Sequence, residues 1–132
     1  MDQPIRLLLA KIGLDTHTIG ITVLAKELRD RGIEVIFSGL KQTPEQVVRA
    51  ALQEDVDVIG VSCLSGGHMT HLRVLAEQMR AVGIDDRVLI VGGVVPEEDV
   101  EPLKAIGVDA VFTMGANMDD IAAYLRSAVA AA

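Results

Sequence analysis

A lysine, an aspartate and a histidine lie close together in one glycine-containing loop, at Lys11, Asp15 and His17. The loop follows the apolar run Ile5–Ala10. The Asp15 carboxylate could accept a hydrogen bond from the imidazole Nδ1–H of His17, which would leave Nε2 available to a metal. Lys11 could then pair with Asp15. The spacing therefore predicts a relay, Lys11–Asp15–His17, that ends in one good nitrogen donor.

One imidazole cannot by itself form a zinc or iron site. His68 and His71 lie three residues apart, but no cysteine or acid has a convincing spacing with them, so we interpret them as surface or cleft residues. A single histidine favours a metal whose other ligands come from a macrocycle, as in haem and corrinoids. Haem pockets are usually apolar and helical, whereas this loop is polar. Phosphate-binding glycine motifs are absent, and Ser62, Cys63 and Ser65 lack the setting of a nucleophile.

The elements that must position this loop alternate between strand-like and helix-like patterns. Thr43, with Pro44 and Gln46, predicts a capped helix start, and Gly32 and Gly107 predict helix ends. The predicted strands are Ile5–Ala10, Ile33–Phe37, Val56–Val61, Arg87–Val91 and Asp109–Phe112; the predicted helices are Thr18–Arg31, Thr43–Glu54, His68–Val82, Pro96–Ile106 and Asn117–Ala130. Five βα units predict an α/β fold, a flavodoxin-like (Rossmann-like) open five-stranded parallel sheet with helices on both faces. We expect residues 1–132 to form a single domain.

Four glycine-containing loops follow predicted strands and should open on the carboxyl edge of the sheet, where such folds bind ligands. They are Lys11–Gly20, Ser62–Gly67, Gly92–Gly93 and Thr113–Gly115. Glycine lets the backbone approach a ligand closely, so the four loops together favour a large, flat ligand. The alternative is that these glycines only end strands in tight turns.

The composition excludes several classes of protein. The net charge of −7 comes without a basic cluster, which argues against nucleic-acid binding. The single cysteine cannot form an internal disulfide and is typical of a reducing cytoplasm. No apolar run approaches the roughly 18 residues of a membrane span, so we expect a cytoplasmic protein that is not in a membrane.

The residues Asp15–Gly20 resemble the Asp-x-His-x-x-Gly signature of cobalamin-binding domains. Forty-one residues separate Gly20 from Ser62-Cys63-Leu64, which is similar to the Ser-x-Leu element of the family, and another 27 separate Leu64 from its Gly-Gly element at Gly92-Gly93. The stretches LLAKIGLD, QTPEQVV, GVSCLSGGHMT and VGGVVPEED resemble the cobalamin domain of acyl-CoA mutases over nearly the whole chain. The opening MDQPIR and the SGL at Ser38–Leu40 resemble most the 2-hydroxyisobutyryl-CoA type, beside the methylmalonyl-CoA type.

This resemblance implies adenosylcobalamin as the cofactor, with its benzimidazole base displaced and His17 as the lower axial ligand of cobalt. The nucleotide tail would lie between the sheet and the helix after the first loop. The implied cofactor-binding residues are Lys11, Asp15, His17, Gly20, Ser62, Leu64, Gly66, Gly92, Gly93, Thr113 and Gly115. The implied function is the small subunit of an isomerase that carries out a radical 1,2-rearrangement of an acyl-CoA. A large acyl-CoA-binding subunit, a (β/α)₈ barrel, would cover the upper corrin face.

Two positions depart from the family pattern. Thr18-Ile19 replaces a charged pair after the histidine, and Met114-Gly115-Ala116 replaces Pro-Gly-Thr near the last strand. The alternatives that remain are a corrinoid carrier for methyl transfer, a cobalamin-dependent regulator, the small subunit of glutamate mutase and a flavodoxin-like module without a ligand. The carrier usually has a preceding helical segment, and the regulator needs an output domain; neither is evident here.

Overall fold

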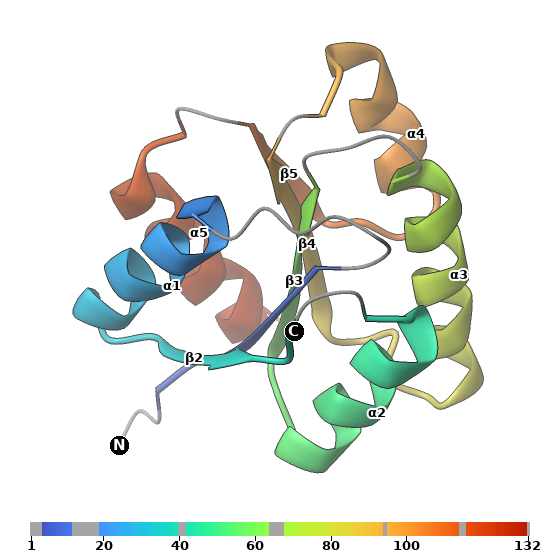
Figure 1. The fold of residues 1–132 in the computed structure, drawn as a ribbon, viewed down its shortest axis with the longest axis horizontal. Helices are drawn as coiled ribbons and strands as arrows, with labels where there is room; N and C mark the ends of the chain where they lie inside the picture. The colour runs from blue at the N-terminus through green and yellow to red at the C-terminus, as the bar shows by residue number, and fades with distance from the viewer. Residues whose placement is uncertain are drawn as a thin grey trace.

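The computed structural model describes residues 4–11, 19–39, 42–63, 68–93, 95–113 and 116–131. Strands and helices alternate along the chain (Figure 1). The strands are β1 (Arg6–Ala10), β2 (Glu34–Phe37), β3 (Val58–Cys63), β4 (Val88–Gly93) and β5 (Ala110–Thr113). The helices are α1 (Ile19–Asp30), α2 (Pro44–Glu54), α3 (His68–Ala81), α4 (Val100–Ala105), preceded by the 3₁₀ turn η1 (Glu97–Asp99), and α5 (Met118–Ala131). The predicted α/β fold is therefore confirmed.

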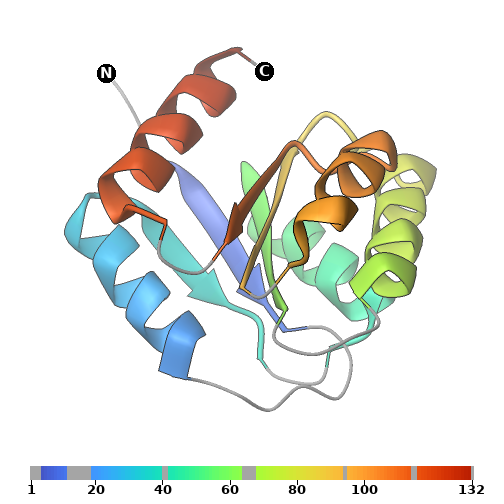
Figure 2. The same ribbon diagram turned by 90° about the horizontal axis from the view of Figure 1, so that it is seen from above.

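The five strands form one parallel sheet in the order β2-β1-β3-β4-β5. Helices α1 and α5 cover one face, and α2, α3 and α4 cover the other (Figures 1 and 2). Side chains alternate between these faces along each strand, so the buried strands are apolar throughout. In β1, for example, Leu7 and Leu9 face α1 and α5, whereas Leu8 and Ala10 face α2 and α3.

The helix boundaries follow from local chemistry. Thr43 caps α2: its hydroxyl accepts a hydrogen bond from the Gln46 N–H at 3.1 Å, and the Gln46 side chain accepts from the Thr43 N–H at 2.8 Å. This reciprocal pair is the predicted capping box. Gly32 and Gly107 follow α1 and α4 with φ of 88° and 121°, a backbone conformation that glycine adopts without strain.

The predicted boundaries differ most from the structure at the ends of β3 and β4 and in the fourth helix. Ser62 and Cys63, expected in a loop, extend β3 because they pair with Gly92 and Gly93, which likewise extend β4. The predicted helix Pro96–Ile106 is divided into η1 and α4. Pro102 lacks an N–H group and its ring crowds the preceding turn, so an α-helix can include it only within its first turn, and α4 begins at Val100.

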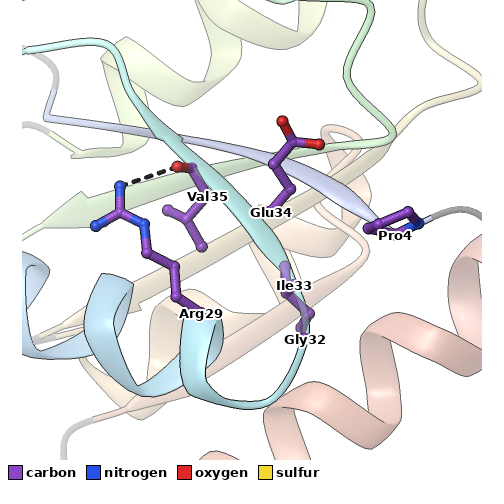
Figure 3. Close-up of a pocket in the computed structure, with 6 residues that line it drawn as sticks. All are labelled: Pro4, Arg29, Gly32, Ile33, Glu34 and Val35. Atoms are coloured by element: carbon purple, nitrogen blue, oxygen red, sulfur yellow. Dashed lines mark hydrogen bonds between the residues drawn. The ribbon is translucent and has the colours of Figure 1, made fainter.

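At the amino edge of the sheet, the Arg6 guanidinium lies 3.1 Å from Glu54 and 3.8 Å from Glu34. A shallow depression near this end is lined by Pro4, Arg29 and the residues 32–35, and Figure 3 shows the Arg29 guanidinium over the outer side of β2. None of the helices in the described part of the chain is long and apolar enough to span a bilayer.

Candidate functional site

The sheet reverses its strand order beside β1, which has β2 on one side and β3 on the other. In open α/β sheets of this kind, ligands bind beyond the carboxyl ends of the strands at such a reversal. The segment that carries Asp15 and His17 follows β1 in the sequence. Both residues lie outside the described part of the chain, so the relay that ends in His17 stays a prediction.

Lys11, the first member of that relay, directly follows β1 and is fully buried. Its backbone carbonyl accepts a hydrogen bond from the Gln42 N–H at 3.0 Å, which ties the end of β1 to the segment that leads into α2. A buried ammonium group is costly unless hydrogen bonds or an opposite charge compensate it. The burial of Lys11 therefore agrees with a structural or electrostatic task at this edge rather than with a solvated surface lysine.

Residues of three neighbouring strands meet side by side at the carboxyl edge. Ser62 of β3 pairs with Gly92 of β4, which in turn pairs with Phe112 of β5. Because side chains alternate along strands, these three positions share the face covered by α1 and α5 with Val88 and Ile90 deeper in the core. Val88 and Ile90 are buried, whereas Ser62, Gly92 and Phe112 are partly exposed.

The glycines on this face have no side chain that projects from the sheet. A Cβ placed on Gly92 would lie 3.3 Å from the carbonyl oxygen of Phe112, and one on Gly60 would lie 2.9 Å from Cδ2 of Leu9. The space above Gly60 is therefore already filled by core side chains, whereas a side chain at Gly92 would project from the partly exposed end of β4. At the strand ends, Ser62 and Gly92 are partly exposed and carry little or no side chain, so a flat or ring-containing group can lie close to the backbone there.

Helix α5 leaves this surface partly uncovered. The Arg31 Nε atom, just after the end of α1, donates to Oδ1 of Asp119 in the first turn of α5 at 2.7 Å. The start of α5 thus lies beside the end of α1 rather than beside its beginning, and Figure 2 shows α5 running away from the carboxyl edge. Tyr124 of α5 packs edge-on against Phe112, with ring centroids 5.6 Å apart, and burial raises the pKa of Tyr124 with a further contribution from Asp109.

The structure places part of the predicted site and leaves part undescribed. Lys11, Gly20, Ser62, Gly92, Gly93 and Thr113 lie at the carboxyl edge: Gly20 in the first turn of α1, the others at or next to strand ends. Asp15, His17, Leu64, Gly66 and Gly115 lie outside the described residues. His68 begins α3, and His71 is partly exposed one turn later. The described residues contain no group of three His, Cys, Asp or Glu side chains that could hold a metal ion.

Two contributors were missed in the sequence: Phe112 and Arg31. Phe112 looked like an ordinary strand residue. Arg31 and Asp119 are 88 residues apart, and no local pattern predicts their contact.

Comparison with known proteins identifies the family. The family described as B12 binding domain matches residues 5–123. The 2-hydroxyisobutanoyl-CoA mutase small subunit of Aquincola tertiaricarbonis is 48% identical over 132 residues, which cover 99% of this chain and 97% of that subunit. The pivalyl-CoA mutase small subunit of Xanthobacter autotrophicus is 44% identical over 90% of this chain and 80% of that subunit. The methylmalonyl-CoA mutase large subunit of Streptomyces virginiae is 43% identical, but this chain spans only 17% of its length.

Solved structures agree on the fold. A cobalamin-binding protein from Desulfitobacterium hafniense matches with a TM-score of 0.81 at 22% identity over 96% of this chain and 60% of that one. A two-component response regulator from Clostridium difficile matches with 0.71 at 14% identity over 96% of both chains, so the fold alone does not determine the ligand. The sequence relatives decide the matter: this chain belongs to the B12-binding domain family, in the group that contains the small subunits of acyl-CoA mutases.

Proposed function

We propose that this chain is the cobalamin-binding small subunit of an adenosylcobalamin-dependent mutase that acts on a branched acyl-CoA of the 2-hydroxyisobutanoyl-CoA type. The observation that carries the proposal is the 48% identity to such a small subunit over practically the full length of both chains. The structure supports it through the partly exposed positions Ser62 and Gly92 at the strand ends, which suit the nucleotide tail of a corrinoid. Residues 1–132 act as one domain in this proposal.

The residues of this chain bind and orient the cofactor. His17 would ligate the cobalt, and Asp15 would accept the imidazole Nδ1–H and fix its tautomer. Lys11, which is buried at the end of β1, would hold the charge of Asp15. The remaining predicted residues line the tail site: Gly20, Ser62, Leu64, Gly66, Gly92, Gly93, Thr113 and Gly115. When bound, adenosylcobalamin supplies the organic radical that starts the carbon-skeleton rearrangement.

A partner must complete the active site. The chain spans a small part of the one-piece and large-subunit relatives, which contain much more sequence than a cobalamin domain. We propose that a large barrel subunit binds the acyl-CoA, covers the carboxyl edge and excludes water from the reacting groups. The assembly would work in the reducing cytoplasm.

Electron paramagnetic resonance tests the ligation by His17. Cobalt(II) cobalamin bound to the chain should show superhyperfine splitting from one axial nitrogen, a triplet with ¹⁴N. Labelling the protein histidines with ¹⁵N should convert it to a doublet, and His71→Ala should leave the spectrum unchanged. A splitting that follows ¹⁵N in the benzimidazole instead would show that the base stays on cobalt and would contradict the proposal.

Reconstitution tests the partner and the substrate. The chain, the large subunit and adenosylcobalamin should co-elute and isomerise 2-hydroxyisobutanoyl-CoA, with activity that saturates as small subunit is added. Methylmalonyl-CoA serves as the comparison substrate. Full turnover by the isolated chain, or methyl transfer from methylcobalamin to a thiol acceptor, would contradict the assignment and favour the corrinoid carrier.

A further inference from the structure

The C-terminal end of α1 is tied to a neighbouring element on each side. On one side, Arg29 Nη2 donates to the carbonyl oxygen of Val35 in β2 at 2.9 Å (Figure 3). On the other side, Arg31 Nε donates to Oδ1 of Asp119 in α5 at 2.7 Å. The Arg126 guanidinium of α5 donates in turn to the carbonyl oxygen of Arg31 at 2.6 Å. We call these four residues, Arg29, Arg31, Asp119 and Arg126, the α1 anchor.

The guanidinium of Arg31 is held in one orientation. Its Nη1 atom donates to the backbone carbonyl of Glu27 at 2.9 Å and to the Glu27 carboxylate at 2.8 Å, while Nε reaches Asp119. A planar guanidinium that binds three acceptors from two helices fixes direction as well as distance. A second charged pair of α1, Lys26 with Asp30 at 2.8 Å, lies within the helix.

The anchor determines how far α5 reaches along the sheet. Asp119 and Arg126 are about two helical turns apart and both bond to Arg31, so the first half of α5 must lie beside the end of α1. The first turns of α1 therefore extend toward the carboxyl edge without α5 beside them (Figure 2). There Ile21 and Ala25 pack on the sheet, and Ser62 and Gly92 stay partly exposed.

We propose that the α1 anchor is a positioning element that fixes the end of α1 far from the cofactor and keeps the tail surface open. The inference rests on the proposed cobalamin function. Arg31 is 27% exposed and Asp119 78% exposed, and ion pairs this exposed add little to stability. The contribution of the anchor is therefore geometric: it holds one end of α1 and leaves the first turns, which contact the sheet through apolar side chains, to adjust around the tail.

The test uses the full chain and two readouts. Arg31→Met removes the guanidinium and keeps the apolar stem, and Lys26→Met is the matched control on the same helix. Spin labels on the exposed positions 23 and 127, in a Cys63→Ser background, report the distance between α1 and α5 without cofactor. Titration with adenosylcobalamin, followed by absorption, gives the dissociation constant. Circular dichroism checks that each variant is folded.

We expect Arg31→Met to broaden the distance distribution and to raise the dissociation constant about two- to tenfold, as the fraction of chains with the open arrangement falls. Lys26→Met should change neither. Arg31→Lys should have a distance distribution and a dissociation constant close to those of the wild type, because an ammonium group can still reach Asp119. Asp119→Asn serves as a second variant and should behave like Arg31→Met.

The outcomes separate the anchor from the function. Arg31→Met and Asp119→Asn with wild-type distances overturn the inference, whatever the cofactor does. Altered distances with an unchanged dissociation constant overturn the link to the cofactor. Failure of the wild-type chain to bind adenosylcobalamin, alone or with the large subunit, refutes the proposed function, and the spin-label result still stands.

Discussion

The two faces of the sheet differ most where they approach the carboxyl edge. On the face covered by α2, α3 and α4, the apolar core continues to this edge through Val61, Val91 and Val95, which are all buried. On the face covered by α1 and α5, burial ends earlier, and Ser62 and Gly92 are partly exposed. Adjacent residues of the same strand therefore have different tasks.

The difference shows how one thin sheet can combine stability with binding. On the face with three helices, burial reaches the carboxyl ends of the central strands at Val61 and Val91. On the other face, burial extends to Leu9 and Ile90, and the positions beyond them, Ser62 and Gly92, are partly exposed. A substitution on the first face should thus change the free energy of unfolding, and one near the carboxyl edge of the second should change the affinity for cobalamin.

The largest effect on stability should come from the closed face. Leu89, fully packed in β4, faces α3 and α4, and Leu89→Ala should lower the free energy of unfolding by about 2–5 kcal/mol because a cavity remains. Urea unfolding followed by circular dichroism measures this. The cobalamin affinity of the folded protein should not change; a marked loss would mean that the two faces are coupled.

Asp15→Asn should have the opposite effect to Leu89→Ala: it should weaken cobalamin binding and leave the stability unchanged. An amide cannot stabilise the imidazole of His17 as a carboxylate does, so cobalamin affinity or turnover should fall about 10–100-fold. The unfolding midpoint should stay at the wild-type value. Lys11→Ala should reduce affinity less. Wild-type affinity in the Asp15 variant would remove this carboxylate from the site.

Two glycines offer a direct comparison of the edges. Gly83 follows α3 at the amino edge with φ of 80°, so Gly83→Ala should lower the free energy of unfolding by about 1–2 kcal/mol and leave affinity intact. Gly92→Ala adds a methyl group on the open surface and should weaken cobalamin binding by about 1 kcal/mol, or roughly fivefold. Equal affinity losses in both variants would contradict the assignment of the surface.

The smallest effect concerns the cap of α2, on the closed side of the carboxyl edge. Thr43→Ala removes the hydroxyl that accepts from Gln46 and should lower the free energy of unfolding by about 1 kcal/mol. Thermal unfolding at fixed protein concentration measures it. Thr43→Ser should keep wild-type stability, and neither variant should alter cobalamin binding.

Local chemistry explains what the sequence could predict. The cap at Thr43 and the glycine after α1 depend on residues within one turn, and both were predicted at the right positions. The strand end at Cys63 was missed because polarity suggested a loop, whereas backbone pairing with Gly93 does not depend on the side chain. Asn117, expected as helical, lies outside α5 and accepts from the Asp119 and Asp120 N–H groups.

The site was predictable to the extent that its residues lie in short motifs. Asp15, His17 and the glycine pair share a spacing that resembles the family, and the family itself is confirmed. The open surface was not predictable in this way, because it depends on where α5 begins relative to α1. That position depends on the contact of Arg31 with Asp119 and on the packing of Tyr124 against Phe112. Such distant pairs leave no periodic signal in one sequence.

The contact of Arg29 with β2 has a consequence for the behaviour of the chain at high concentration. β2 is an edge strand, and the N–H groups of Glu34 and of Ser38, the residue after β2, donate to the carbonyl oxygens of Ile5 and Leu9 in the neighbouring segment. The carbonyl of Val35 faces the other way and accepts from Arg29. A strand from a second molecule would have to displace a charged side chain to reach that carbonyl. Arg29 therefore hinders the addition of a strand from another molecule at the free edge of the sheet. Such strand addition is the usual first step of aggregation in β-sheet proteins.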